Sequence, residues 1–112
     1  WVCEKEPIAG AESFSAGRAF QIGSLTVETR LTSGHAAGGV TYFIQGLSKL
    51  VAIVGDSMFA GSMGGGMVSY ADALRNNRDQ ILTLPDATIV CSGHGPLTTV
   101  GEQKHANPFF AA

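Results

Sequence analysis

The stretch VAIVGDSMFAGSMGG, residues 51–65, decides how this chain folds. Its first residues extend an apolar run over residues 50–54, and a run that is apolar throughout is typical of a central strand. The run ends at Gly55, where the backbone can turn sharply, and Asp56 follows. We therefore expect the Asp56 side chain to project from the end of a sheet.

Two other stretches repeat this arrangement with a histidine in place of the aspartate. TSGH, residues 32–35, follows a run of strand-forming residues, and so does CSGHG, residues 91–95. Histidine and aspartate are ligands of zinc and iron hydrolase centres. Together the stretches suggest a site that His35, Asp56 and His94 assemble from separate loops.

Alternation and capping patterns predict the elements around these loops. Residues 1–17 are polar and irregular, so we expect a loop or linker there. Strands are expected at residues 18–22, 25–31, 40–44, 50–54 and 88–91. A helix capped by Ser69 should end at Pro85, and a shorter helix capped by Thr99 should end near Asn107.

The composition fits one folded domain with part of its surface covered. The chain has 112 residues, of which 45% are hydrophobic and only 14% are charged, whereas about a quarter are charged in typical soluble domains. This low charge hints that something else covers part of the surface. The net charge of −2 argues against nucleic acid or an anionic membrane as a partner.

The lengths of the apolar runs and the number of cysteines indicate the cellular compartment in which the protein is expected. No apolar run approaches the roughly 20 residues of a membrane-spanning helix. Residues 1–6 lack the basic and apolar segments of a signal peptide. The two cysteines, Cys3 and Cys91, are too few for a disulfide framework. We therefore expect a cytoplasmic protein with no membrane partner.

With these residues in place, the chain resembles the C-terminal half of a metallo-β-lactamase-fold hydrolase of the glyoxalase-II-like type. The resemblance covers residues 18–110 and rests on four stretches in the family's order. They are TSGHAAGGVTYFI (32–44), VAIVGDSMFAGSMGG (51–65), LPDATIVCSGHGPLTT (84–99) and EQKHANPFF (102–110). It implies an α/β (α+β) fold, in which residues 1–112 form a single domain that is half of a four-layer αββα sandwich.

The resemblance also implies roles for individual residues. His35 would bind the first metal, Asp56 would bridge two metals and act in catalysis, and His94 would bind the second metal. The loops would be shaped by Gly34, Gly55, Gly93 and Gly95. The complete family site holds two zinc ions, with iron or manganese as alternatives. There a metal-bound hydroxide attacks a small-molecule substrate, with thioesters as the leading class and other esters also open.

Two features depart from the family. The family's other ligands lie in a His-any-His-any-Asp-His motif of the N-terminal half, whereas the histidines here are His35, His94 and His105. Gly65 stands where many relatives of this type carry an arginine. We therefore expect an incomplete site, with weak or no metal binding and no activity by this chain alone.

Two functions are compatible with the sequence. In the first, the chain is part of a metal-dependent hydrolase, and its partner is the missing N-terminal half. In the second, it is a non-catalytic half-domain that self-associates or pairs with another chain through an apolar, uncovered sheet face. A nuclease of the same fold is disfavoured because the chain lacks a basic patch.

Overall fold

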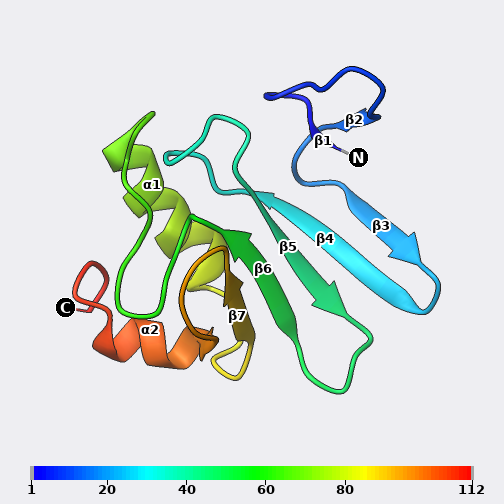
Figure 1. Cartoon of the computed structure of the whole chain (residues 1–112). Coiled ribbons are helices and arrows are strands. Elements are labelled where there is room, and N and C mark those ends of the chain that lie inside the picture. Colours follow the sequence, from blue (N-terminus) through cyan, green and yellow to red (C-terminus); the bar gives the residue numbers. More distant parts are fainter. Residues whose placement is uncertain (1, 112) are drawn as a thin grey trace.

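The computed structural model describes residues 2–111, and its main feature is a six-stranded sheet (Figure 1). The strands lie in the order β3-β4-β5-β6-β7-β8. Their bounds are β3 Ala19–Ile22, β4 Leu25–Leu31, β5 Val40–Gln45, β6 Val51–Gly55, β7 Ile89–Ser92 and β8 Thr98–Thr99. The first five match the predicted strands to within one residue at each end, and β8 was not predicted.

The connection between β6 and β7 brings two of the candidate ligands to one edge. Strands β3 to β6 form an antiparallel meander, and β7 then pairs with β6 in parallel. A parallel pair needs a long crossover, which here holds α1 (Tyr70–Asn76) and a π-helical turn, η1 (Asn77–Ile81). The helix predicted to reach Pro85 is thus α-helical only in its first part. Because β6 and β7 are parallel, Asp56 and His94 follow strands that end at the same edge.

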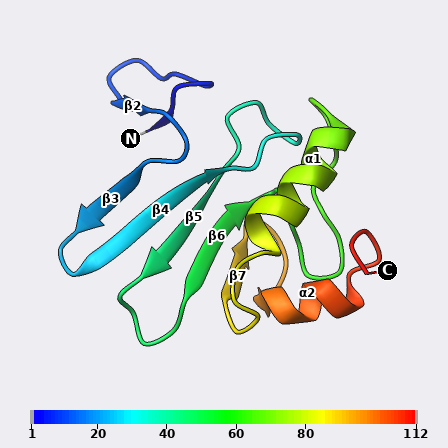
Figure 2. The ribbon, with the colours of Figure 1, turned by 180° about the vertical axis from the view of Figure 1, so that it is seen from behind.

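The helices pack on one side of the sheet, and their starts follow the capping patterns. Figure 2 shows α1 in front of the strands and α2 (Val100–Ala106) close to β7. The Ser69 hydroxyl accepts a hydrogen bond from the Asp72 backbone N–H, and the Thr99 hydroxyl accepts one from the Glu102 N–H. No helix in the described part of the chain is long and apolar enough to cross a membrane.

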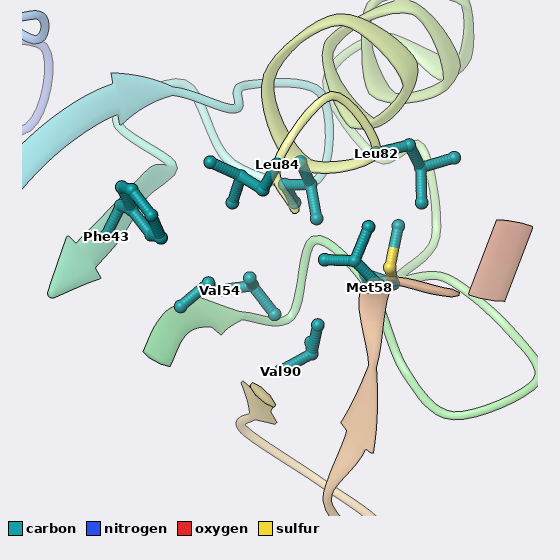
Figure 3. Close-up of a cluster of buried hydrophobic side chains, with 9 residues drawn as sticks. Phe43, Val54, Met58, Leu82, Leu84 and Val90 are labelled. Carbon is teal, nitrogen blue, oxygen red and sulfur yellow. The ribbon is translucent and has the colours of Figure 1, made fainter. Parts of the chain in front are cut away.

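Alternate residues of the central strands form the core against these helices (Figure 3). Ala52 pairs with Phe43 on β5 and with Val90 on β7, and all three are buried. Met58 and Leu84 pack on the same cluster from the segments that flank the crossover. Fully burying a side chain of this size contributes roughly 1.5–3 kcal/mol. We call this side, with Phe43, Ala52, Val54 and Val90, the helix face.

The opposite side of the same strands is also apolar but carries no helix (Figures 1 and 2). There Ile53 pairs with Tyr42 and Cys91, and Ile53 is 43% exposed. We call this side, with Tyr42, Ile44, Val51, Ile53 and Ile89, the bare face. The described residues thus form one helical layer on one sheet, which is the mixed α+β arrangement that the sequence predicts.

The N-terminal segment packs against one end of the bare face. It contains a short parallel strand pair that the sequence did not predict, β1 (Val2–Cys3) with β2 (Ser13–Phe14). The ring of Phe14 meets that of Phe20 edge-on, with centroids 5.4 Å apart, and lies 6.4 Å from that of Tyr42. Burial raises the pKa of the Tyr42 hydroxyl, and Cys3 raises it further.

Candidate metal centre

The three predicted ligands meet at the edge where β4, β6 and β7 end. Strands β4 and β6 run in the same direction because both are antiparallel to β5, and β7 is parallel to β6. The loops that carry His35, Asp56 and His94 therefore leave the sheet together. Asp56 lies between the imidazoles: its Oδ2 is 3.6 Å from His35 Nε2, and its Oδ1 is 2.9 Å from His94 Nδ1.

The Nε2 atom of His35 faces Asp56, and in the neutral ring this nitrogen carries no proton. His35 Nδ1 lies 2.8 Å from the Gly65 carbonyl oxygen. A carbonyl only accepts hydrogen bonds, so Nδ1 carries the hydrogen and Nε2 keeps its lone pair. Nε2 and the ionised carboxylate therefore face each other as two acceptors. This arrangement is favourable when a cation or a second proton lies between them.

His94 approaches the other oxygen of the same carboxylate. An ionised carboxylate is acceptor-only, so His94 Nδ1 donates a hydrogen bond to Asp56 Oδ1. The ring meets Phe59 edge-on, with centroids 6.0 Å apart. The His94 side chain is 78% exposed, whereas the His35 side chain is 30% exposed. His94 is therefore the more open of the two imidazoles.

The His35–Asp56 separation suits two atoms that share a cation, whereas the His94–Asp56 contact is a hydrogen bond. Bonds of about 2.1 Å to a tetrahedral zinc place two ligand atoms about 3.4 Å apart. The His35–Asp56 and His94–Asp56 separations lie on either side of this value. Within residues 2–111, no three or more His, Cys, Asp or Glu side chains are grouped so that they could hold a metal ion. Asp56 therefore contacts His35 through Oδ2 and His94 through Oδ1, as two separate pairs.

Two glycines allow the loops to pack directly on Asp56. A side chain at Gly93 would collide with Asp56 Oδ1, and one at Gly64 would collide with the Asp56 carbonyl oxygen. The other glycines that were expected to shape the ligand loops have positive φ angles: 137° at Gly34, 57° at Gly55 and 86° at Gly95. The close approach explains why the loops around this carboxylate are rich in glycine.

Polar side chains that the sequence did not identify hold the ligand loops in place. Ser57 Oγ donates to the Thr32 carbonyl oxygen at 3.1 Å, which ties two ligand loops together. Asn77 Nδ2 donates to the Ser57 carbonyl oxygen at 2.8 Å, and Asn76 Nδ2 donates to the Ser33 carbonyl oxygen at 2.9 Å. Local sequence patterns do not reveal these contacts, because each joins positions at least 20 residues apart.

Comparison with known proteins places the chain beside metallo-hydrolases. No family profile matches it. The chain is 37% identical over 93 residues to the probable metallo-hydrolase YqgX of Bacillus subtilis, which covers 79% of this chain and 42% of the relative. It is 30% identical over 96 residues to the hydroxyacylglutathione hydrolase GloC of Haemophilus influenzae, which covers 83% and 44%. The chain spans about half the length of the curated relatives it matches.

Solved structures share the same fold. The crystal structure of the BLEG-1 B3 metallo-β-lactamase superposes with a TM-score of 0.80 at 35% identity, covering 97% of this chain and 55% of the other. A structure of TTHA1623 in a di-iron-bound form superposes with a TM-score of 0.74 at 26% identity, covering 92% and 50%. The predicted α+β half of a metallo-β-lactamase sandwich is thereby confirmed.

Proposed function

The chain belongs to the metallo-β-lactamase superfamily of metallo-hydrolases, and on this premise we propose that it carries half of the active site of a metal-dependent thioester hydrolase. The likeness to a hydroxyacylglutathione hydrolase supports a small thioester as the substrate, with other esters as the second choice. The free cysteines Cys3 and Cys91 support a cytoplasmic location.

One observation carries this proposal: the lone pair of His35 Nε2 faces Asp56 Oδ2 at 3.6 Å. The Gly65 carbonyl holds the ring proton on the far nitrogen, so no hydrogen bond can form between the two acceptors while the ring is neutral. A cation between the two acceptors relieves this repulsion. The arrangement is therefore suited to a metal rather than to a hydrogen bond.

In this proposal Asp56 would be shared by two metals. His35 and Asp56 would hold the first metal, and His94 and Asp56 would hold the second, so the carboxylate would offset part of the repulsion between the cations. Zinc suits these ligands, and iron and manganese accept the same ones. The di-iron-bound relative supports iron as an alternative. When bound, the metals supply Lewis-acid activation of water near neutral pH.

The proposal includes an incomplete site on this chain. Three protein side chains are too few for two tetrahedral metals, since a catalytic zinc has three protein ligands of its own. The relatives are about twice as long as the chain, which supports a second half that supplies the remaining ligands. We expect the 112-residue chain alone to bind metal weakly and to hydrolyse nothing.

Hydrolysis of a hydroxyacylglutathione thioester by the full-length protein that carries this chain tests the proposal. Asp56→Asn should lower kcat by at least about 100-fold, because even second-layer changes at metal sites cost 10–100-fold. Asp86→Asn is the matched control, because Asp86 is an exposed aspartate paired with Lys104. Equal activity of the two variants, or no thioester hydrolysis by the wild type, would contradict the proposal.

A second candidate function is favoured by the bare face. It is a non-catalytic half-domain that self-associates or pairs with another chain through this apolar surface, where Ile53 is 43% exposed. Sedimentation of the purified chain, together with metal analysis, separates the two functions. A stable metal-free homodimer favours the half-domain, whereas a co-purifying partner that supplies metal ligands favours the hydrolase.

A further inference from the structure

A buried polar cluster at the end of α2 binds the loop that packs over His35 and Asp56. We call residues 59–65 the covering loop. The centre of the cluster is formed by Asn107, which is 0% exposed, and Gln103, which is 3% exposed. Among the described residues, the hydrogen bonds of these two side chains do not reach His35, Asp56 or His94. Direct contact with a candidate ligand therefore does not explain why the two amides are buried.

The cluster holds the first part of the covering loop by hydrogen bonds to Gly61 and Ser62, and a further bond joins Asn107 to Gln103. Asn107 Nδ2 donates to the Ser62 carbonyl oxygen at 2.9 Å and to Gln103 Oε1 at 2.8 Å. The Gly61 backbone N–H donates to the same Gln103 oxygen at 2.9 Å. On the other side, Gln103 Nε2 donates to Thr98 Oγ1 at 2.8 Å. Every polar atom of the two amides except Asn107 Oδ1 is used here, and that oxygen accepts from the Phe109 N–H at 3.0 Å.

These bonds do more than terminate a helix. As the residue after α2, Asn107 ends the helix through its backbone N–H, which bonds to the Gln103 carbonyl oxygen. Its side-chain donors instead reach a loop 45 residues earlier in the chain. In a buried setting, a satisfied network of this kind specifies one arrangement of the groups it joins, because a broken bond leaves an unpaired polar atom.

The far end of the same loop lies on the candidate metal centre. Gly64 packs against the Asp56 backbone so closely that it has no room for a side chain. The next carbonyl, that of Gly65, accepts the hydrogen bond from His35 Nδ1 at 2.8 Å. Only Met63 and Gly64 lie between Ser62, which the cluster holds, and Gly65, whose carbonyl oxygen faces His35 Nδ1.

We propose that Asn107 and Gln103 are positioning residues for His35: by fixing the covering loop they keep the Gly65 carbonyl on Nδ1 and so leave the Nε2 lone pair directed at Asp56. This inference rests on the proposed function in one respect: that the Nε2 lone pair of His35 binds a metal. The effect runs from the end of α2 through the hydrogen bond to Ser62, along the backbone of residues 62–65, and through the Gly65 carbonyl to the imidazole.

The test reads the proton on His35 directly, without metal or substrate. Long-range nitrogen–proton NMR spectra of the 112-residue chain at about pH 8 distinguish the two neutral tautomers, since an ordinary imidazole has a pKa of about 6.5. The chain has three histidines, so the imidazole signals are simple to assign. The exposed His105 serves as an internal reference. The wild type should show His35 only as the Nδ1–H tautomer.

Two pairs of variants decide the outcome. Asn107→Ala and Gln103→Leu remove loop contacts and should give a mixture of tautomers at His35. Gln103→Glu keeps the acceptor for Gly61 and should retain the wild-type tautomer. Val100→Ala is the control for stability, because Val100 is a fully buried residue of the same helix that contributes to the apolar core.

Retention of the pure Nδ1–H tautomer in folded Asn107→Ala and Gln103→Leu would overturn the proposal. So would an equal shift in Val100→Ala, since loss of stability alone would then explain it. If Asn107→Ala does not fold, the contrast between Gln103→Leu and Gln103→Glu decides. None of these results depends on hydrolysis, so failure of this inference is distinct from failure of the thioester assay.

Discussion

The two faces of the sheet are built from alternate residues of the same strands, yet they differ in what covers them. On the helix face, Val54 and Val90 are 1% and 0% exposed. Ile53 precedes Val54 in β6 and pairs with Cys91, and on the bare face it is 43% exposed. Both faces are apolar, so the difference lies in the layer above each face and not in the strands. The strands of this chain present an apolar face on both sides; the helical layer covers one face, and the N-terminal segment covers only one end of the other.

The largest difference in unfolding free energy should come from shortening an isoleucine to alanine on each side of the sheet. Ile81→Ala empties a site at the end of η1 that is 0% exposed, where the helical layer meets the core, and should lower the unfolding free energy by about 2–5 kcal/mol. Ile53→Ala on the bare face should cost about 1 kcal/mol or less, because that side chain already meets solvent. Urea unfolding of both variants measures the difference, and equal losses would remove the distinction between the faces.

A smaller effect is expected where the helical layer holds the ligand loops. Asn77→Ala removes the donor to the Ser57 carbonyl at a buried position and should cost about 1–3 kcal/mol. Asn76→Ala removes a similar bond to Ser33 at a half-buried position and should cost less. Urea unfolding gives the loss of unfolding free energy for each variant. The ratio of the two losses shows how strongly burial determines the contribution of such a hydrogen bond.

On the bare face, a charge should act on association more than on folding. Ile53→Asp should weaken self-association of the isolated chain at least about tenfold, since burying an isoleucine contributes roughly 1.5–3 kcal/mol. Sedimentation equilibrium of the wild type and the variant measures this. Unchanged association would show that the isolated chain meets its partner through some other surface.

The smallest effect is expected at an exposed ion pair, Asp86 with Lys104. A hydrogen bond from Lys104, together with its charge, holds the pKa of the fully exposed Asp86 carboxyl below its ordinary value of 3.8. A lowered folded-state pKa adds stability above the unfolded pKa, and that stability is lost as the pH falls through the folded-state value. Lys104→Ala should therefore reduce the loss of stability as the pH falls from about 5 to below the folded-state pKa. An identical acid profile for wild type and variant would contradict this.

The five longer strands and the helix caps were predictable because each depends on a local pattern. The alternation over residues 25–31 marks a half-covered strand, and Ser69 and Thr99 mark helix starts without reference to the rest of the chain. The convergence of His35 and Asp56 follows from one further rule, that strands running in the same direction end at the same edge.

The supports of the site were not predictable, because they join distant positions through the backbone. Gly65 was noted only for the arginine it replaces, yet its carbonyl sets the proton on His35. The amides of Asn77 and Asn107 look like ordinary helix-end residues, and only the fold brings Ser57 and Ser62 against them. The π-helical turn and the two-residue strands likewise carry no periodic signal.

The most direct measurement is a zinc titration of the 112-residue chain followed by the NMR signals of its three imidazoles. We predict that the His35 and His94 signals move together, only at zinc concentrations above the micromolar range, while His105 does not respond, and that Asp56→Ala abolishes the change. Saturation at sub-micromolar zinc would show that the chain needs no second half. A response at His105 alone, or one that survives the loss of Asp56, would show that the carboxylate between the two rings is not a metal ligand.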